Sequence, residues 1–283
     1  MQSSAQHLQA ASLKTYRQLP KRPPLALACS LRQRAPMNQC RLLILIFTIT
    51  LGAQSARGGG DHNASLWLNY FGDHPIQNSP WQIHLDTQIR RADYGRQWQQ
   101  FLIQPGINYE INDRVKLGLG YGYMETDPYG DHPVPFELPE HRIYEQISVD
   151  TPLWGQNWQH RFRWEQRFLG TPTSLTATDY RFRFENRFRY RLQTIMSMRC
   201  LGGSEIYLRL YDEVFVNVGS DVAHNHFDQN RAYIGIGKRI RKHIKCEFGF
   251  MEQTLQQRSG SVWENNHTLI FSLSSGQPAG NEF

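Results

Sequence analysis

Apolar and polar residues alternate along the chain from Ser65 to Leu273, as they do in β-strands whose two faces meet different surroundings. The clearest runs are 81–90 and 115–123, in which Ile, Leu, Val and Tyr alternate with polar residues or glycine. No segment keeps a helical spacing of apolar residues for long. The pattern predicts eleven strands, at approximately 65–71, 80–92, 98–111, 114–126, 140–151, 157–169, 179–192, 205–218, 229–240, 244–256 and 264–273.

The length of these strands favours a membrane barrel over a soluble sheet. Most span about 12 to 14 residues, whereas strands of soluble proteins peak at about 5 to 6 and membrane-spanning strands need about 9 to 11. The connections also alternate, with short ones at 112–113, 151–156 and 241–243 and longer ones at 127–139, 170–178 and 219–228. Short turns at one end and long loops at the other are typical of outer-membrane barrels.

The sequence therefore predicts an all-β fold, an antiparallel up-and-down β-barrel of the outer-membrane type with about 10 strands (10 to 12). Counting from residue 80 gives ten strands and places both ends on the short-turn side. The segment 65–71 then remains as a plug, a periplasmic extension or part of a twelve-stranded closure. The Asp-His-Pro sequences at 73–75 and 131–133 predict turns.

The segments 159–169 and 180–192 divide charged and aromatic residues between two strand faces. The predicted charged face, completed by a glutamate from 205–218, comprises Arg161, Arg163, Glu165, Arg167, Arg181, Arg183, Glu185, Arg187, Arg189 and Glu213. The opposite face comprises Phe162, Trp164, Phe168, Phe182, Phe184 and Phe188. For adjacent long strands this pattern favours a barrel with the aromatic residues toward lipid and the charges toward a polar lumen.

Arginines stacked at about 5 Å repel one another unless carboxylates lie between them. Glu165, Glu185 and Glu213 are expected to intercalate as a ladder. The lumen would then hold either an internal salt-bridge plug or a cationic stripe that favours anions in an open pore. The plug is preferred, because barrels of about this size have interiors that side chains can fill.

The basic charge of the chain is concentrated at its beginning. Residues 1–55 contain lysine and arginine but no acid, so the remainder carries nearly equal numbers of acidic and basic side chains, and the pI of 9.2 does not indicate a nucleic-acid partner. Arg41 followed by the apolar run 42–51 predicts a cleaved secretory signal peptide at 37–55. Residues 1–36 are then a start-site artefact or a disordered leader, and 56–283 a single barrel domain.

Candidate chemistry is sparse. The chain has no nucleophile elbow, no HExxH zinc motif and no phosphate-cradling loop, so no cofactor is predicted. His224, His226 and Asp228 form a weak metal candidate on a predicted loop. A hydrolase could use His141, His160 or His224. Cys200 and Cys246 would either pair in an oxidising periplasm or remain free thiols.

Several elements resemble one bacterial family. They are Glu140–Tyr144 (EHRIY), Arg161–Phe168 (RFRWEQRF), Asp212–Phe215 (DEVF), Phe227–Arg231 (FDQNR) and Ile234–Gly237 (IGIG), and over roughly 64–273 the chain resembles the family called domain of unknown function 2490. The resemblance implies an exported, outer-membrane-like barrel without an established activity, so it transfers no functional residues. The chain departs from an ordinary barrel ending, since Phe283 does not directly close the last strand.

Three functions remain open. The chain is expected to be a structural or weakly conducting barrel of the outer membrane, with membrane lipid and the outer-membrane assembly machinery as partners. The first alternative is an outer-membrane enzyme, a hydrolase or a lipid-modifying enzyme. The second is a soluble periplasmic, lipocalin-like binder of an apolar ligand, which would place aromatic residues inside and charges outside.

Overall fold

The computed structural model describes residues 61–130, 133–174, 179–198 and 205–276. The expected signal peptide, the leader, Cys200 and Phe283 lie outside these residues. Within them the chain forms a short 3-10 turn, Asp93–Gly95, and the strands β1 (Asp61–Pro75), β2 (Trp81–Ala92), β3 (Gln97–Asn112), β4 (Val115–Thr126), β5 (Leu138–Leu153), β6 (Gln156–Pro172), β7 (Tyr180–Ser197), β8 (Ile206–Val218), β9 (Phe227–Arg241), β10 (Ile244–Gln256) and β11 (Trp263–Gly276).

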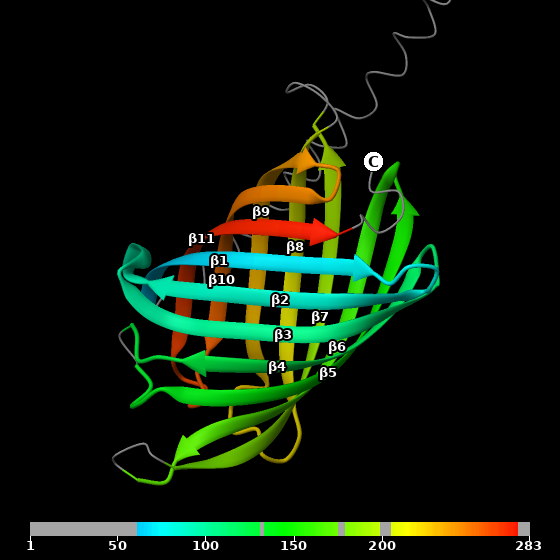
Figure 1. The fold of residues 1–283 in the computed structure, drawn as a ribbon. Coiled ribbons are helices and arrows are strands. Elements are labelled where there is room, and N and C mark those ends of the chain that lie inside the picture. The colour runs from blue at the N-terminus through cyan, green and yellow to red at the C-terminus, as the bar shows by residue number, and fades with distance from the viewer. Residues whose placement is uncertain (1–60, 131–132, 175–178, 199–204, 277–283) are drawn as a thin grey trace, which may run out of the picture. The chain divides into compact units, whose positions relative to one another are not determined.

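These strands form one closed barrel in which neighbours in sequence are neighbours in space (Figure 1). Every consecutive pair is antiparallel. The closing pair, β1 and β11, is parallel, with Asp61 beside Glu264 and Asp73 beside Gly276. The predicted all-β barrel of 10 to 12 strands is confirmed, with eleven strands in the described chain and one parallel pair.

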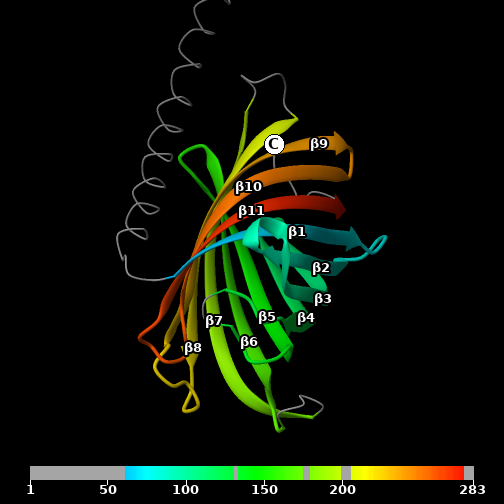
Figure 2. The same ribbon diagram turned by 90° about the vertical axis from the view of Figure 1, so that its left-hand side faces the viewer.

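Of the three alternatives for the first segment, part of the barrel closure is the nearest, although the described barrel closes with eleven strands and not twelve. Residues 65–71 are neither a plug nor an extension, because they form the middle of β1, which hydrogen-bonds to β2 as well as to β11. The expected turn at Asp73–Pro75 is instead the end of this strand. With an odd number of strands, the chain enters the barrel at one end and leaves it at the other (Figure 2).

The two ends of the barrel differ in their connections. The turn end carries the connections 76–80, 113–114, 154–155, 198–205 and 242–243, and the loop end carries 93–96, 127–137, 173–179, 219–226 and 257–262. Three connections at each end have the expected lengths, short at the turn end and longer at the loop end. The exceptions are 93–96, which is short at the loop end, and 198–205, which is longer at the turn end.

The barrel has a polar interior and an apolar outer face. In β2, Gln82, Asp86, Gln88 and Arg90 are buried, while Ile83 between them is exposed. Among the described residues, buried polar and charged side chains outnumber buried apolar ones. This is the opposite of the arrangement that the lipocalin-like alternative requires. No helix in the described part of the chain is long and apolar enough to cross a membrane.

Glycines on β4 make room for a large side chain inside the barrel. Tyr144 of β5 is almost completely buried, and its ring lies over Gly120. A Cβ atom at Gly120 would overlap with the ring of Tyr144. The alternation of Gly118, Gly120 and Gly122 with outward-facing Leu and Tyr residues therefore has a packing cause.

We expect Gly120→Ala to lower the free energy of unfolding by about 1 to 3 kcal/mol, the usual cost of overpacking. Urea unfolding of the refolded protein measures this change. The double variant with Tyr144→Ala is the control, since removing the ring should make the added methyl group nearly neutral. If Gly120→Ala lowered the free energy of unfolding equally in the wild type and in Tyr144→Ala, the assigned contact with the Tyr144 ring would be contradicted.

Candidate functional site

Packed side chains separate two cavities in the described part of the lumen. The loop-side cavity has a volume of about 120 Å³ and is lined by residues that include Arg90, Arg187 and Arg231. The turn-side cavity has a volume of about 380 Å³ and is lined by residues that include Arg161 and Lys245. Of the residues that line them, only Asp86 lines both.

An ion-pair network from β6, β7 and β8 crosses the space between the cavities. Glu165 is 0% exposed, and its two oxygens accept hydrogen bonds from Arg187 at 2.6 Å and 2.8 Å and from Arg189 at 2.6 Å. Glu213 accepts from Arg189 at 2.8 Å and from Arg161 at 2.6 Å. The five side chains therefore form one line of alternating charge, Arg187, Glu165, Arg189, Glu213 and Arg161.

The register of β6 and β7 explains this alternation. Glu165 lies opposite Arg187, whereas Arg163 lies opposite Arg189, which places two like charges side by side. Arg163 donates hydrogen bonds to Gln146 at 2.7 Å and 3.0 Å, and its guanidinium lies 4.1 Å from the centre of the Tyr144 ring. Glu165 thus neutralises the middle of the arginine row, and Arg163, whose guanidinium lies 3.8 Å from the Glu165 carboxylate, makes its hydrogen bonds to neutral groups.

A second group of charges lies nearer the loop end. Glu140 binds Arg142 at 2.5 Å and Arg167 at 2.6 Å. Glu185 pairs with Arg183 and lies 3.8 Å from Arg167. Glu185 therefore belongs to this group and not to the line through Glu165 and Glu213. Arg181 is exposed and takes part in none of the ion pairs found among the described residues.

The predicted aromatic face lies on the outside of the barrel. Phe162, Trp164, Phe182 and Phe184 are between 36% and 44% exposed. Phe168 and Phe188 are half-buried on the same face, where neighbouring rings cover them. The rings form cross-strand contacts, with the centres of Phe162 and Tyr190 5.0 Å apart and those of Phe168 and Phe184 5.4 Å apart.

A stack of cations and aromatic rings in the loop-side cavity could not be predicted from the sequence. The guanidinium of Arg90 lies 3.9 Å from the centre of the Trp67 ring, and that of Arg231 lies 5.2 Å from it. Arg231 also lies 4.8 Å from the centre of the Phe215 ring, which Arg189 approaches at 4.3 Å. These residues come from five strands, and no spacing in one sequence shows that they meet; the inward alternation of Arg90 with Asp86 and Gln88 was the one available signal.

Tyr129, on the connection between β4 and β5, also lines the loop-side cavity. Burial, with a smaller contribution from the nearby Glu264 carboxylate, raises the pKa of Tyr129 to about 12. Its hydroxyl therefore remains neutral at physiological pH.

The weak metal candidate is not assembled. Asp228 is an extra residue at a bulge between β8 and β9, and it turns into the lumen, where its carboxylate binds Arg187 at 2.8 Å. His224 and His226 are exposed. In the described part of the chain, no three His, Cys, Asp or Glu side chains are arranged to hold a metal ion.

The three histidines considered for a hydrolase do not contact a carboxylate in the described chain. His141 and His160 lie 2.5 Å and 2.9 Å from the hydroxyl oxygens of Tyr121 and Tyr190. The histidines that do contact a carboxylate are others: His84 with Asp73 at 2.8 Å, and His267 with Glu252 at 2.7 Å. Cys246 is a half-buried free thiol on β10.

Comparisons with known proteins identify a family for this chain but name no activity. The chain is 24% identical over 238 residues to an uncharacterized protein of Methylorubrum extorquens, a match that covers 81% of this chain and 96% of that protein. A solved structure of the NanC porin aligns with a TM-score of 0.42 and 12% identity, over 68% of this chain and 84% of that one. Residues 64–265 match the model of the family described as protein of unknown function (DUF2490). Because this match spans more than half of the sequence, the chain belongs to the DUF2490 family.

Proposed function

We propose that the protein is an exported barrel of the bacterial outer membrane with a closed lumen, acting as a structural element or as a weakly conducting pore. The observation that carries this proposal is the distribution of charge, because ionised side chains fill the interior while exposed aromatic and aliphatic residues cover the outside. A barrel in lipid needs an apolar outer band, and a soluble one does not.

The packing between the two cavities supports a closed lumen. On one wall, Trp67, Tyr233, Met251 and Ile270 form a cluster of buried apolar side chains. Trp67 lines the loop-side cavity, whereas Tyr233 and Ile270 line the turn-side cavity, so the cluster separates the two. The ion pairs of Glu165 close the opposite wall. We therefore expect little ion conductance through the unmodified barrel.

The partners in this proposal follow from the location. Membrane lipid would contact Phe162, Trp164, Phe168, Phe182, Phe184 and Phe188, and the outer-membrane assembly machinery would insert the chain after export by its signal peptide. The lumen side chains, with Arg161, Arg163, Arg189 and Glu213 among them, would stiffen the barrel from inside. No nucleic acid and no cofactor belong to this proposal.

Heat modifiability tests the location. Residues 37–283 would be expressed in a Gram-negative host, and the membrane fraction would be compared on a gel with and without boiling. We expect the protein to need detergent for extraction and the unboiled band to migrate faster, because a closed barrel stays compact until it is boiled. A freely soluble periplasmic protein without a band shift would overturn the proposal.

Planar-bilayer recording tests the closed lumen separately. We expect few or small currents from the wild-type barrel and larger ones from Met251→Ala combined with Tyr144→Ala, which removes buried side chains from inside the barrel. Leu269→Ala, an exposed position on β11, is the matched control. Large steady currents from the wild type would show an open pore.

A further inference from the structure

The loop-side cavity carries an excess of positive charge. Six arginines line it: Arg90, Arg142, Arg167, Arg187, Arg189 and Arg231. Its lining contains two carboxylates, Asp86 and Asp228. Arg142, Arg167, Arg187 and Arg189 each have a carboxylate partner within 2.8 Å, supplied by Glu140, Glu165, Glu213 or Asp228. The remaining two, Arg90 and Arg231, account for the excess.

Arg90 and Arg231 contact neutral groups instead. Arg90 donates hydrogen bonds to Gln88, at 2.7 Å and 3.0 Å, and to Gln100. Arg231 donates from Nε to Gln229 at 3.1 Å. Neither takes part in an ion pair within the described chain. Asp86, the nearest carboxylate in sequence to Arg90, accepts a hydrogen bond from Gln88 at 2.8 Å.

The aromatic rings only partly offset the cost of these charges. A cation over an aromatic face gains less free energy than the same ion loses when it is taken out of water. Arg90 is only 5% exposed, so its guanidinium bears nearly all of this desolvation cost. A bound anion would supply the missing partner, because charge-assisted hydrogen bonds to guanidinium are the stronger kind.

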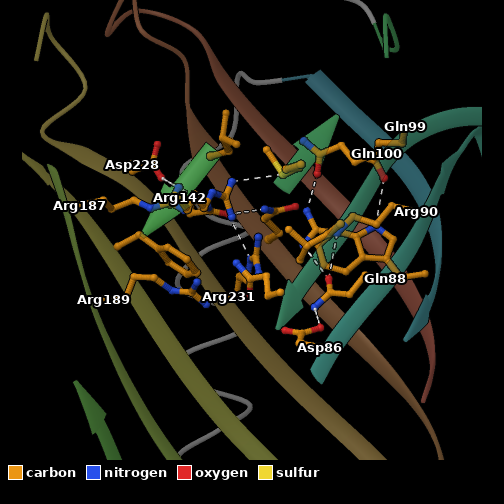
Figure 3. A pocket seen from close by; sticks show the side chains of 18 of the residues that line it. Asp86, Gln88, Arg90, Gln99, Gln100, Arg142, Arg187, Arg189, Asp228 and Arg231 are labelled. Carbon is orange, nitrogen blue, oxygen red and sulfur yellow. Dashed lines mark hydrogen bonds and ion pairs between the residues drawn. The ribbon is translucent and has the colours of Figure 1, made fainter. Parts of the chain in front are cut away.

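The geometry leaves donors and room for such an anion. The two terminal nitrogens of Arg231 donate no hydrogen bond to any described residue, and Arg231 lines the cavity together with Arg90 (Figure 3). Both guanidinium groups approach the ring of Trp67, which brings them to one place in the lumen. A volume of about 120 Å³ holds about four waters at ~30 Å³ each, or one small oxyanion.

We propose that the loop-side cavity binds a small oxyanion, a phosphate or carboxylate group, between the guanidinium groups of Arg90 and Arg231. The planar fork of arginine matches the oxygens of both kinds of group. In the turn-side cavity, Arg161, Arg209 and Lys116 pair with Glu213, Glu247 and Glu110. Arg191 also lines that cavity and has no ion pair among the described residues, but its strand neighbour is Arg161, which is already paired, so this cavity is less suited. The site goes beyond the proposed function, since it lies inside the barrel whether or not lipid surrounds it.

Calorimetric titration of the full refolded barrel in detergent micelles tests the site. Inorganic phosphate and acetate would be titrated separately at low ionic strength in a buffer without other oxyanions. We expect saturable binding of at least one probe, weakened at least tenfold by Arg231→Gln and by Arg90→Gln. Arg96→Gln, which removes the same charge from an exposed connection at the loop end, should bind as the wild type does.

A second readout keeps the test valid if one variant assembles poorly. An anion that binds only the folded barrel raises its urea midpoint. We expect the better-binding probe to raise the midpoint of the wild type and of Arg96→Gln, and to leave that of Arg231→Gln unchanged. Binding of phosphate alone, of acetate alone or of both probes supports the site and identifies the class of anion. The absence of saturable binding, or binding that is the same in Arg231→Gln, would overturn it.

Discussion

Glu165→Gln is expected to lower the free energy of unfolding by about 3 to 5 kcal/mol, the cost of removing one partner from a buried ion pair. The reason is that Glu165 has no exposed surface and is the shared acceptor of Arg187 and Arg189. Without its charge, Arg189 keeps Glu213 and Arg187 keeps Asp228, but the row of arginines on β6 and β7 loses the carboxylate at its centre. Urea unfolding of the refolded barrel, followed by its unboiled gel band, measures the loss.

Glu145→Gln is the matched control for this prediction. Glu145 directly follows Tyr144, the residue opposite Glu165; it is exposed on the outer face and lies opposite Trp164. Its replacement should change stability by no more than about 0.5 kcal/mol. Adding Arg189→Gln to Glu165→Gln should recover part of the loss, since the pairs of Arg187 with Asp228 and of Arg161 with Glu213 remain. Equal effects of the two glutamate variants would contradict the assigned network.

Trp164→Arg should cost about 2 to 4 kcal/mol if the outer face meets lipid, because Trp164 lies at the middle of β6. Phe182→Arg, near the loop end of β7, should cost about 0 to 1 kcal/mol, the value near a membrane interface. The amount of folded barrel in the membrane fraction and its urea midpoint in lipid vesicles measure both changes. Tyr94→Arg, at a position that is 80% exposed on the connection after β2, is the control.

The difference in cost between the two positions distinguishes an outer face that meets lipid from one that meets water. Trp164 and Phe182 have similar exposed fractions, 36% and 44%. In water, charged substitutions at such surface positions would cost similar and small amounts. A Trp164→Arg variant that assembles as well as Phe182→Arg would therefore contradict a lipid-facing orientation.

Local alternation is the reason that most strands could be predicted from the sequence. The expected strands at 244–256 and 114–126 differ from β10 and β4 by at most one residue. A two-residue period depends only on neighbouring residues, and a membrane barrel imposes it on every strand. The extent of β1 was not predictable, because Gly72, Asp73 and Pro75 are typical turn residues, and β11, which pairs in parallel with β1 as far as Asp73, lies at the other end of the sequence.

The lumen contacts were predictable only where they join adjacent strands. Contacts of Glu165 with Arg187 follow from the register of β6 and β7. The approach of Arg90 and Arg231 to Trp67 joins β2, β9 and β1, and it depends on the curvature of the whole sheet. The bulge that turns Asp228 toward Arg187 is likewise a tertiary feature, which is why a loop motif of histidines and aspartate was a misleading indication of metal binding.

The parallel pair of β1 and β11 also sets the order in which the barrel can form. Every other pair joins consecutive strands, so each closes a short loop, whereas this pair closes a loop of nearly the whole domain. Closure entropy grows by about 0.6 kcal/mol per doubling of loop length, and contacts of long sequence separation form slowly. We therefore expect the hairpins between consecutive strands to form first and β1 to pair with β11 last. Until then the curled sheet has two open edges, and this interval is when the chain is most exposed to pairing with another molecule.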